Sequence, residues 1–382
     1  MKQGWEIKKL GEVFDLQMGK TPSRDNGDYW GGDNVWVAIS DLQDKYIGES
    51  KEHITDTALT ETKIKKIKAG TTIMSFKLSV GRAAITTQDL YTNEAIMAFN
   101  LNEGYDLIAD YIYYYLKGYK WQGANKAVMG ITLNKASISQ NHIAIPPIEE
   151  QERIVAELDC LSGVIEKKRE QLRELDALTQ SIFYQMFGDP ITNEKRWEVK
   201  KLGEVGKVIT GNTPSTKDEE NYSSNDYCFV KPSDIGKDYV TKIENTEFYI
   251  SEKAFSQSRR LSKGSVLTTC IGIIGKVGIL KVDATCNQQI NAILPDENSI
   301  SEYVAWAIYL TRSVLENIAN APVVPIINKG EFSNIVIPLP PKVLQQEFAD
   351  KIEAIEKQKE LIKQSITQTE ELFNSRMDYY FN

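Results

Sequence analysis

The sequence is poor in the residues that most often build metal and nucleophile sites. It has four cysteines, none in a Cys-x-x-Cys pair, and only two histidines, His53 and His142. A zinc site needs several such ligands at close spacing, so we expect no metal site and idle thiols in a reducing compartment. The same scarcity leaves no Ser-His-Asp pattern, and we assign no catalytic residue.

Long apolar runs are also missing. No stretch approaches the roughly 18–20 apolar residues that cross a bilayer. The opening residues, MKQGWEIKKL, lack the apolar core of a signal peptide. We therefore expect a cytoplasmic protein.

No nucleotide-binding motif is complete. The Gly-x-Gly-x-x-Gly pattern is absent. The stretch from Gly272 to Val277 has two residues between its glycines where a phosphate loop has four, and Val277 replaces the hydroxyl residue. We predict a strand–turn–strand there. The NPPY-like segment of an adenine methyltransferase is missing as well, so the chain itself is expected to catalyse no reaction.

What the sequence does contain is a repeat. Residues 4–13 read GWEIKKLGEV, and residues 196–205 read RWEVKKLGEV. Further matches follow in the same order: GKTPS and GNTPS, Ser40-Asp41 and Ser233-Asp234, Gly81-Arg82 and Gly275-Lys276, Pro146-Pro147 and Pro340-Pro341. Matched order at a nearly constant spacing indicates one duplicated unit and internal pseudo-two-fold symmetry.

Each copy has two parts. The first is rich in β-branched and aromatic residues between glycine turns, as in NVWVAIS, AGTTIMSF, GSVLTTC and KVGILKV. One helix is expected to interrupt these strands, LIADYIYYYLKGY in the first copy and EYVAWAIYLTRSVLENI in the second. This pattern predicts a compact α+β domain.

The second part of each copy begins at a Pro-Pro pair, a helix start signal. Apolar residues then recur in alternating steps of four and three, which is typical of a coiled coil. The predicted seam is Ile154, Leu158, Leu161, Ile165, Leu172, Leu175 and Ile182 in the first helix, and Phe348, Ile352, Ile355, Ile362, Ile366 and Phe373 in the second, with Lys168 and Lys359 as polar seam positions. The order domain–helix–domain–helix favours an antiparallel helix pair that separates two pseudo-symmetric α+β domains. The predicted segments are 1–147 (domain 1), 148–190 (spacer helix 1), 191–341 (domain 2) and 342–382 (spacer helix 2).

The net charge of −8 at first argues against a nucleic-acid partner. However, the acidic excess is concentrated in the two predicted helices, where residues 148–190 carry 5 basic and 10 acidic groups and residues 342–382 carry 6 and 8. The two domains are close to neutral, with 17 basic and 17 acidic groups in residues 1–147 and 17 and 18 in residues 191–341. A local basic surface therefore remains possible on each domain.

Basic pairs recur at equivalent places in the two copies, in KIKKIKAG and RRLSKG before a strand and at Arg82 and Lys276 in a tight turn. A single lysine is best interpreted as a solvated surface charge. Recurrence favours loops that neutralise DNA phosphates. The candidate DNA-contacting residues are Lys20, Ser23, Arg24, Lys65, Lys66, Lys68, Lys77 and Arg82 in the first copy, and Ser215, Lys217, Lys231, Arg259, Arg260, Lys263 and Lys276 in the second.

The combination of these segments resembles the specificity subunit of type I restriction–modification enzymes. The first copy carries the resemblance in WEIKKLGEV, GKTPS, DYWGGDNVWVAISDL, IPPIEEQERIV and FYQMFGDP, and the second in WEVKKLGEV, GNTPS, NYSSNDYCFVKPSDI, LPPKVLQQEF and SRMDYYF. The second copy departs at Tyr222-Ser223-Ser224, which stands where the first has Tyr29-Trp30-Gly31, and LPPKVLQQEF lacks the EEQ pattern.

The resemblance implies two target-recognition domains that read the halves of a split, asymmetric site in double-stranded DNA. It also implies two methyltransferase subunits docked on the helices, which would bind S-adenosylmethionine and methylate adenine at N6, and restriction subunits for cleavage. The chain itself would hold no cofactor. The alternative is a structural adaptor with two protein-binding domains on a coiled-coil spacer, which the acidic net charge favours.

Overall fold

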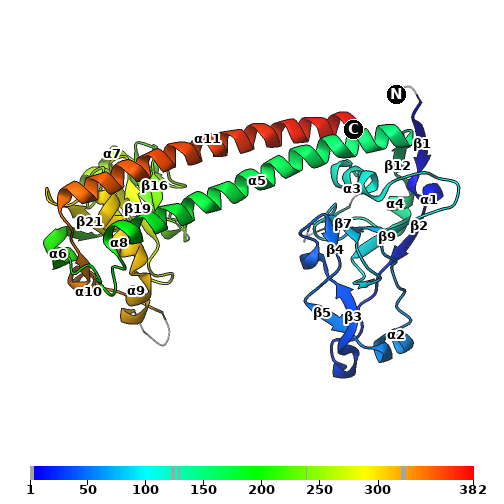
Figure 1. Cartoon of the computed structure of the whole chain (residues 1–382), viewed down its shortest axis with the longest axis horizontal. Helices are drawn as coiled ribbons and strands as arrows, with labels where there is room; N and C mark the ends of the chain where they lie inside the picture. The colour runs from blue at the N-terminus through cyan, green and yellow to red at the C-terminus, as the bar shows by residue number, and fades with distance from the viewer. Residues whose placement is uncertain (1–3, 122–124, 128–129, 238, 320–323) are drawn as a thin grey trace. The chain divides into compact units, whose positions relative to one another are not determined.

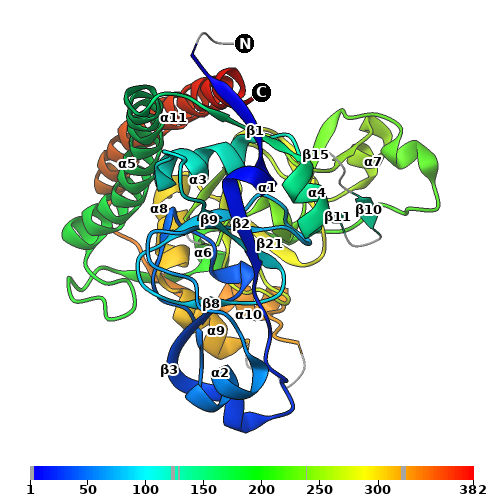
Figure 2. The same ribbon diagram turned by 90° about the vertical axis from the view of Figure 1, so that its right-hand side faces the viewer.

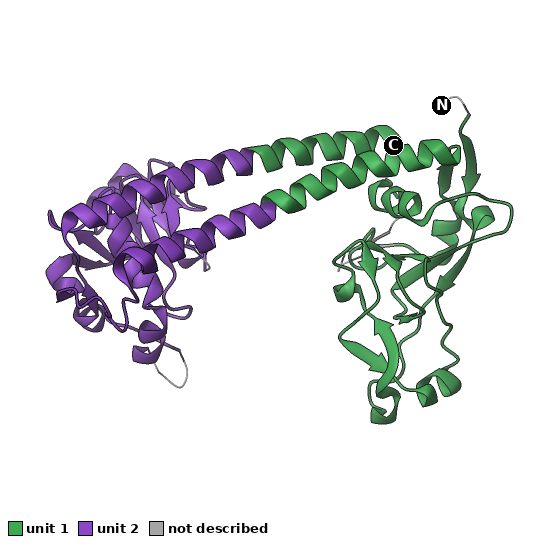
Figure 3. Cartoon of the chain, in the orientation of Figure 1, with its two compact units in different colours: residues 1–168, 365–382 green, residues 169–364 purple. Residues whose placement is uncertain are grey.

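The computed structural model describes residues 4–121, 125–127, 130–237, 239–319 and 324–382. The chain divides into two compact units, unit 1 (residues 1–168 and 365–382) and unit 2 (residues 169–364), which Figure 3 shows in different colours. Two helices of 40 residues, α5 (Ile148–Phe187) and α11 (Lys342–Phe381), contribute to both units. No described helix combines the length and apolar composition that crossing a membrane requires.

Unit 1 contains a mixed five-stranded sheet of order β2-β9-β6-β7-β4, a three-stranded sheet of order β5-β3-β8, and the pairs β1-β12 and β10-β11. The three-stranded sheet and α2 lie at the opposite end of the unit from its α5 and α11 segments (Figures 1 and 2). The strands are β1 (Glu6–Lys9), β2 (Phe14–Met18), β3 (Trp30–Val37), β4 (Tyr46–Ile47), β5 (Glu52–Ile54), β6 (Thr72–Ser75), β7 (Ala83–Thr86), β8 (Tyr91–Thr92), β9 (Ile96–Leu101), β10 (Asn125–Ala127), β11 (Gly130–Thr132) and β12 (His142–Ile145). The short helices are α1 (Leu10–Val13), α2 (Asp56–Thr62), α3 (Ala109–Gly118) and α4 (Lys135–Gln140).

Unit 2 repeats this topology, with sheets of order β14-β21-β18-β19-β16, β17-β15-β20 and β13-β22. Its strands are β13 (Val199–Lys201), β14 (Gly206–Thr210), β15 (Tyr227–Val230), β16 (Thr241–Ile243), β17 (Tyr249–Ile250), β18 (Val266–Thr269), β19 (Val277–Leu280), β20 (Ala284–Cys286), β21 (Ile290–Pro295) and β22 (Val336–Pro338). Its short helices are α6 (Leu202–Val205), α7 (Glu252–Gln257), α8 (Ser301–Leu310), α9 (Arg312–Ile318) and α10 (Lys329–Asn334). The identical strand order is the structural counterpart of the sequence repeat, and the predicted fold class is confirmed.

One predicted helix is broken in two. EYVAWAIYLTRSVLENI forms α8 and α9 with a kink at Thr311 rather than one continuous helix. The Thr311 hydroxyl donates back to the carbonyl oxygens of Ala307 and Ile308, both at 3.0 Å. Such bonds from a side chain to the preceding turn compete with the regular backbone hydrogen bonds of a helix. A hydropathy pattern does not predict them.

The α5 and α11 segments run antiparallel within each unit. In unit 1, Arg376 of α11 pairs with Glu157 of α5, and the Lys168 ammonium donates to the Ser365 hydroxyl at 2.6 Å. In unit 2, Lys359 pairs with Asp176 at 2.7 Å. Partner numbers fall along α11 as they rise along α5, which is the antiparallel direction that the sequence predicted.

The predicted seam residues all lie at least partly buried, so the alternating four–three pattern marks the packed face of each helix. Six of them are buried, namely Ile154, Leu158, Ile165, Phe348, Ile352 and Ile355, and the others are half-buried. Ile154 and Leu158 join the core of unit 1, while Phe348, Ile352 and Ile355 join that of unit 2. The ends of the seam therefore hold each domain on the helix pair.

A buried glutamine fixes the start of each long helix to its domain. Gln151, fully buried, donates to the carbonyl oxygens of Pro146 and Asp106 at 2.9 and 2.8 Å and accepts from the Ile108 amide at 3.0 Å. Gln345, equally buried, makes the same three bonds with Pro340, Asn298 and Ile300. The second copy has therefore lost only the two glutamates of the EEQ pattern and keeps the residue that forms the contact.

Aromatic side chains fix the far ends of the helices. Phe183 and Phe187 of α5 pack on Tyr303 of α8 with ring centroids 5.6 and 4.8 Å apart. In unit 1, Phe381 of α11 packs on Tyr111 and Tyr115 of α3 at 5.7 and 5.6 Å. Phe183 lies outside the predicted seam, because here α5 turns its face from α11 toward the domain core. The sequence offered one indication that Phe183 is packed, because its repeat partner Met377 is also apolar, and Met377 is buried as well.

Candidate nucleic-acid interface

Three loops gather at one end of the five-stranded sheet in each unit. In unit 1, β2 and β6 both run antiparallel to β9, with Met18 opposite Met97 and Ser75 opposite Ile96. The chain leaving β2, the loop leaving β6 and the turn entering β9 therefore meet there. In unit 2 the register is equivalent, with Thr210 opposite Asn291 and Thr269 opposite Ile290. We call this region the loop end of each sheet.

The Thr-Pro-Ser turns belong to the loop end and are fixed by equivalent bonds. In unit 1 the Lys20 amide donates to the Thr92 carbonyl oxygen at 2.8 Å, and the Thr21 hydroxyl donates to the Glu94 carboxylate. In unit 2 the Thr213 hydroxyl bonds Gln288 at 2.6 Å. A Cβ atom at Gly19 would overlap the Asn93 carbonyl oxygen, so this approach of two backbones requires glycine.

Arg24 follows the first turn and is held in a fixed orientation. Its guanidinium binds the Glu52 carboxylate with both terminal nitrogens and lies 3.9 Å from the ring centroid of Trp30. The guanidinium holds the pKa of Glu52 below its usual value. The indole nitrogens of Trp30 and Trp36 donate to the carbonyl oxygens of Ser23 and Lys20 at 3.1 and 3.0 Å. The arginine is thus exposed but preorganised.

The structure brings several more first-copy candidates to this end. Lys77 and Arg82 begin and end the loop between β6 and β7. The Lys77 ammonium helps to hold the pKa of Glu94 below its usual value, after the hydrogen bond from Thr21. Lys20 is exposed and donates to the Thr62 carbonyl oxygen at 2.7 Å. Ser23 is exposed on the turn itself.

The basic run before β6 lies beside the last residues of β2, because the Gln17 side-chain amide donates to the Lys65 and Lys66 carbonyl oxygens at 3.3 and 3.2 Å. Lys66 and Lys68 both face Asp89, at 3.7 and 2.9 Å. The hydrogen bond from Lys68 holds the pKa of Asp89 below its usual value. Lys65 is exposed, and its carbonyl oxygen accepts from Gln17. Two lysines face one carboxylate and Lys65 precedes them in the sequence, which leaves a local positive excess.

Among the second-copy candidates, Arg259 is the repeat counterpart of Lys65. Arg259 joins the loop end, since its guanidinium donates to the Thr210 carbonyl oxygen at 2.9 Å and its amide donates to Asn212. Ser215 is exposed on the Thr-Pro-Ser turn, and Lys217 is exposed just beyond it. The Lys276 ammonium bonds the Pro232 carbonyl oxygen at 2.9 Å, next to Lys231.

The remaining second-copy candidates are partly engaged within the fold. The Lys231 ammonium lies 3.0 Å from the centroid of the Phe248 ring. Arg260 donates to the Ser256 carbonyl oxygen at 3.2 Å. Lys263 is exposed before β18, on the side where that strand begins.

The sequence reasoning missed the residues that hold these cations in place. Trp30, Trp36 and Glu52 orient Arg24, while Glu94 and Gln288 secure the two threonines. For Glu94 and Gln288, the only signal in the sequence was their position directly after the matched asparagines Asn93 and Asn287. Copy 1 thus places a carboxylate where copy 2 places a neutral amide, which makes the two loop ends electrostatically different.

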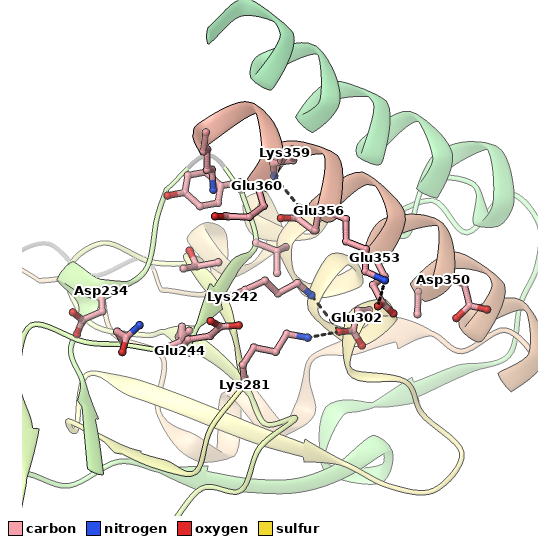
Figure 4. A pocket seen from close by; sticks show the side chains of 18 of the residues that line it. Asp234, Lys242, Glu244, Lys281, Glu302, Asp350, Glu353, Glu356, Lys359 and Glu360 are labelled. Carbon is pink, nitrogen blue, oxygen red and sulfur yellow. Dashed lines mark hydrogen bonds and ion pairs between the residues drawn. The ribbon is translucent and has the colours of Figure 1, made fainter. Parts of the chain in front are cut away.

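A separate groove of about 880 Å³ lies in unit 2 between α11 and the β16 edge of the sheet (Figure 4). The Lys242 and Lys281 ammoniums bracket Glu302 at 3.2 and 3.1 Å. Burial lowers the pKa of Lys242. Burial would raise the pKa of Glu302, but the two ammoniums outweigh it and hold that pKa below its usual value.

The groove is unsuited to DNA because carboxylates outnumber ammoniums along it. Asp350, Glu353, Glu356 and Glu360 line its α11 wall. Its lining holds seven carboxylates and five lysines in all. In unit 1, Lys45 bonds Asp110 of α3 at 2.7 Å and Asp159 of α5 at 2.6 Å, and so joins the domain to the long helix. In both units these lysines are engaged by carboxylates and do not form a phosphate site.

Among the described residues, no cluster of three histidine, cysteine or acidic side chains has a metal-binding arrangement. The four cysteines are free thiols, and three of them are buried. Burial raises the pKa of both Cys270 and Cys286 to about 12. These thiols are unreactive core residues.

Comparison with known proteins points to one family. The family model described as the type I restriction modification DNA specificity domain matches residues 2–176 and again residues 194–371. The MjaIX specificity subunit of a type I restriction enzyme from Methanocaldococcus jannaschii is 25% identical over 90% of this chain and 85% of its own length. The EcoR124I/EcoR124II specificity subunit from Escherichia coli is 27% identical, over 64% of this chain and 63% of its own length.

Solved structures share the fold. A chain from a study of complex assembly and conformational transition in the type I R-M system superposes with a TM-score of 0.67 at 18% identity, covering 100% of this chain and 98% of that one. The type I S subunit from M. genitalium gives a TM-score of 0.55 at 12% identity, covering 98% and 95%. The duplicated architecture is therefore common to this chain and these subunits.

Proposed function

Because the chain belongs to the type I restriction modification DNA specificity family, we propose that it is the DNA-reading subunit of a type I restriction–modification complex. The duplication of the family domain is the observation that carries this proposal. Each domain reads one half of a bipartite site in double-stranded DNA, and the chain leaves the chemistry to its partner enzymes. Two readers on one chain bind together more tightly than either alone, because binding of the first raises the effective concentration of the second.

The two half-sites differ in sequence. The loop end of unit 1 carries Arg24, Trp30 and Glu94, whereas that of unit 2 carries Arg259 and Gln288. Preorganised arginines suit base edges, since a guanidinium fork matches the acceptors of guanine. Exposed lysines suit phosphates, which supply affinity without sequence information. We assign Arg24 to base recognition, and Lys65, Lys66 and Lys68 to contacts with the DNA phosphate backbone.

The partners are two methyltransferase subunits and, for cleavage, restriction subunits. The methyltransferases bind S-adenosylmethionine and take the target adenine out of the stack for N6 methylation. The long helices offer them large apolar side chains that the fold leaves exposed, namely Leu178, Tyr184, Leu361, Leu372 and Tyr379. We place this complex in the cytoplasm, where its DNA substrate is found. The family membership removes the basis for the structural adaptor considered above.

Mapping of modified adenines tests the proposal. Genomic DNA from cells that carry this chain with its methyltransferase partner should show N6-methyladenine in one split motif, with two short defined blocks and an undefined gap. Cells with the methyltransferase alone are the control and should lack the motif. Methylation without a split motif, or an unchanged motif when this chain is omitted, contradicts the proposal.

The phosphate assignment has its own test. Replacing Lys65 and Lys66 together by alanine should weaken binding to all DNA sequences and reduce the slope of log affinity against log salt by up to about two units. Fluorescence anisotropy titrations of the complex at several salt concentrations measure this slope. Alanine at Lys9 and Lys135, exposed lysines near α4, is the matched control. An unchanged slope in the Lys65/Lys66 variant removes both residues from the phosphate contacts.

A further inference from the structure

Both domains present an aliphatic side chain at the tip of the same loop. Leu78, in the loop from β6 to β7, is 59% exposed, and Ile273, in the loop from β18 to β19, is 54% exposed. A single exposed leucine needs no explanation. Here, however, an exposed aliphatic side chain recurs in the same loop of both copies, one position apart. Residues 77–82 (KLSVGR) align with residues 271–276 (IGIIGK), so that Leu78 corresponds to Gly272 and Ile273 to Ser79.

The loops hold these tips outward through identical bonds. The buried Ser75 hydroxyl donates to the Ser79 carbonyl oxygen and accepts from the Arg82 amide at 3.2 Å. In unit 2 the buried Thr269 hydroxyl donates to the Ile273 carbonyl oxygen at 2.6 Å and accepts from the Lys276 amide at 3.0 Å. A loop fixed from within by a hydroxyl cannot fold over to cover its own apolar tip.

The backbone of the first loop is also strained at its tip. Leu78 has φ of +64°, a left-handed conformation that is unfavourable by roughly 1–2 kcal/mol for a residue with a Cβ. In the second loop the counterpart of Leu78 is Gly272, which takes the positive φ without a Cβ, while Gly81 and Gly275 both have positive φ at the matched glycine. Backbone strain at an exposed leucine is of the kind that concentrates at functional sites.

The surroundings of each tip are basic. Lys77 and Arg82 flank Leu78. In unit 2, Lys276 follows the tip, and the Arg312 side chain, which pairs with Glu316 at 2.9 Å, lies against Gly275. Both loops belong to the loop end of their sheets, next to the Thr-Pro-Ser turns. An apolar point set among cations is complementary to a DNA groove, in which base edges lie between two rows of phosphates.

We propose that Leu78 and Ile273 are specificity-determining residues that make apolar contact with thymine 5-methyl groups, one in each half-site. The 5-methyl group is the aliphatic feature that the major groove presents. Adenine methylation provides an A·T pair, and hence a thymine, in each half. The proposal rests on the proposed function and names side chains that supply discrimination rather than charge.

The test uses the chain assembled with its methyltransferase partner and the site obtained from methylation mapping. Leu78→Ala should weaken binding to that site about 5–10-fold, leave nonspecific binding unchanged and leave the salt slope unchanged, because no phosphate contact is lost. Leu78→Asn, which tolerates positive φ, should behave alike. Ile273→Ala should act in the same way on the other half-site. Ile7→Ala and Val199→Ala, which replace equivalent exposed residues of β1 and β13, are the controls and should bind as wild type.

Uracil substitution identifies the contact itself. Replacing the thymines of one half-site by uracil removes only their methyl groups and should weaken the wild-type complex by a similar factor. The same DNA should cause no further loss in the variant whose tip reads that half. Wild-type affinity of the tip variants, or additive losses with uracil, overturns the inference. Failure of the wild-type complex to prefer its mapped site would instead contradict the proposed function, so the two failures are distinguishable.

Discussion

At the scale of single residues, the buried glutamines contribute more to stability than the charged side chains around them. Gln345 is fully enclosed and satisfies two carbonyl oxygens and one amide that have been removed from water. A buried polar group that loses its partner costs more than the bond contributed. One uncharged side chain therefore fixes the first turn of each long helix to its domain.

Gln345→Leu is expected to destabilise the protein by about 2–4 kcal/mol, because three buried backbone groups lose their partner. Urea unfolding followed by circular dichroism measures the free energy of unfolding. Gln346→Leu is the matched control, since Gln346 is exposed and donates to Asp350 within α11. Equal effects of the two substitutions would refute the role of Gln345.

Glu302 makes the stability of unit 2 depend on pH. Its folded-state pKa is lowered, so the stability that it contributes is fully present above its unfolded pKa of about 4.5 and is lost as the pH falls through the lowered value. Glu302→Gln should therefore cost about 1–3 kcal/mol at pH 7, because Lys242 and Lys281 then repel each other, and the difference from wild type should vanish in acid.

Urea unfolding at pH 7 and at a series of pH values below 4.5 measures this difference. Glu353→Gln, at an exposed ion pair with Lys357 in the same groove, should change little at any pH. A constant gap between Glu302→Gln and wild type down to low pH would contradict the assignment.

At the scale of elements, β-branched and aromatic composition predicted the strands, and periodicity predicted the two long helices, since burial of one helix face repeats along the chain. The seam positions such as Ile165 and Ile355 followed from the alternating steps of four and three. Periodicity could not foresee the break at Thr311, which depends on side-chain bonds to the backbone of Ala307 and Ile308, or the change of face at Phe183, which depends on contacts distant in sequence. The same holds for the site, where charge patterns indicated Arg24 but not the partners Glu52 and Trp30 that orient it.

Phe183→Ala is expected to cost about 3–5 kcal/mol, because the ring is fully buried among Phe187, Tyr303 and Phe348. Thermal or urea unfolding measures the loss. Tyr184→Ala, one residue further along α5 and partly exposed, is the control and should have a much smaller effect. A larger loss for Tyr184 would mean that α5 presents a different face to α8.

At the scale of the whole molecule, the pseudo-symmetry lets one half substitute for the other. Unit 1 uses Met377 and Phe381 from α11, and their repeat partners in α5 are Phe183 and Phe187. A second copy of the first half could therefore supply what α11 supplies in the intact chain.

A fragment of residues 1–189 is accordingly expected to dimerise through its α5 segment. With the methyltransferase partner it should direct methylation to a palindromic site made of two copies of the first half-site. Sedimentation and methylation mapping measure the two outcomes. Adding Ile154→Asp, which puts a charge in the seam, should abolish both, whereas a monomeric fragment would refute the seam assignment.

Unit 1 is formed from both ends of the sequence, so its folding during synthesis depends on when the second of these segments is made. Residues 365–382 leave the ribosome after residues 169–364, roughly 10–40 s after the first 168 residues at ordinary rates of translation. Until then the core around Tyr111 lacks Phe381 and Tyr380. The core of unit 1, whose residues are mostly synthesised first, therefore cannot be completed until the residues of unit 2 have also been synthesised.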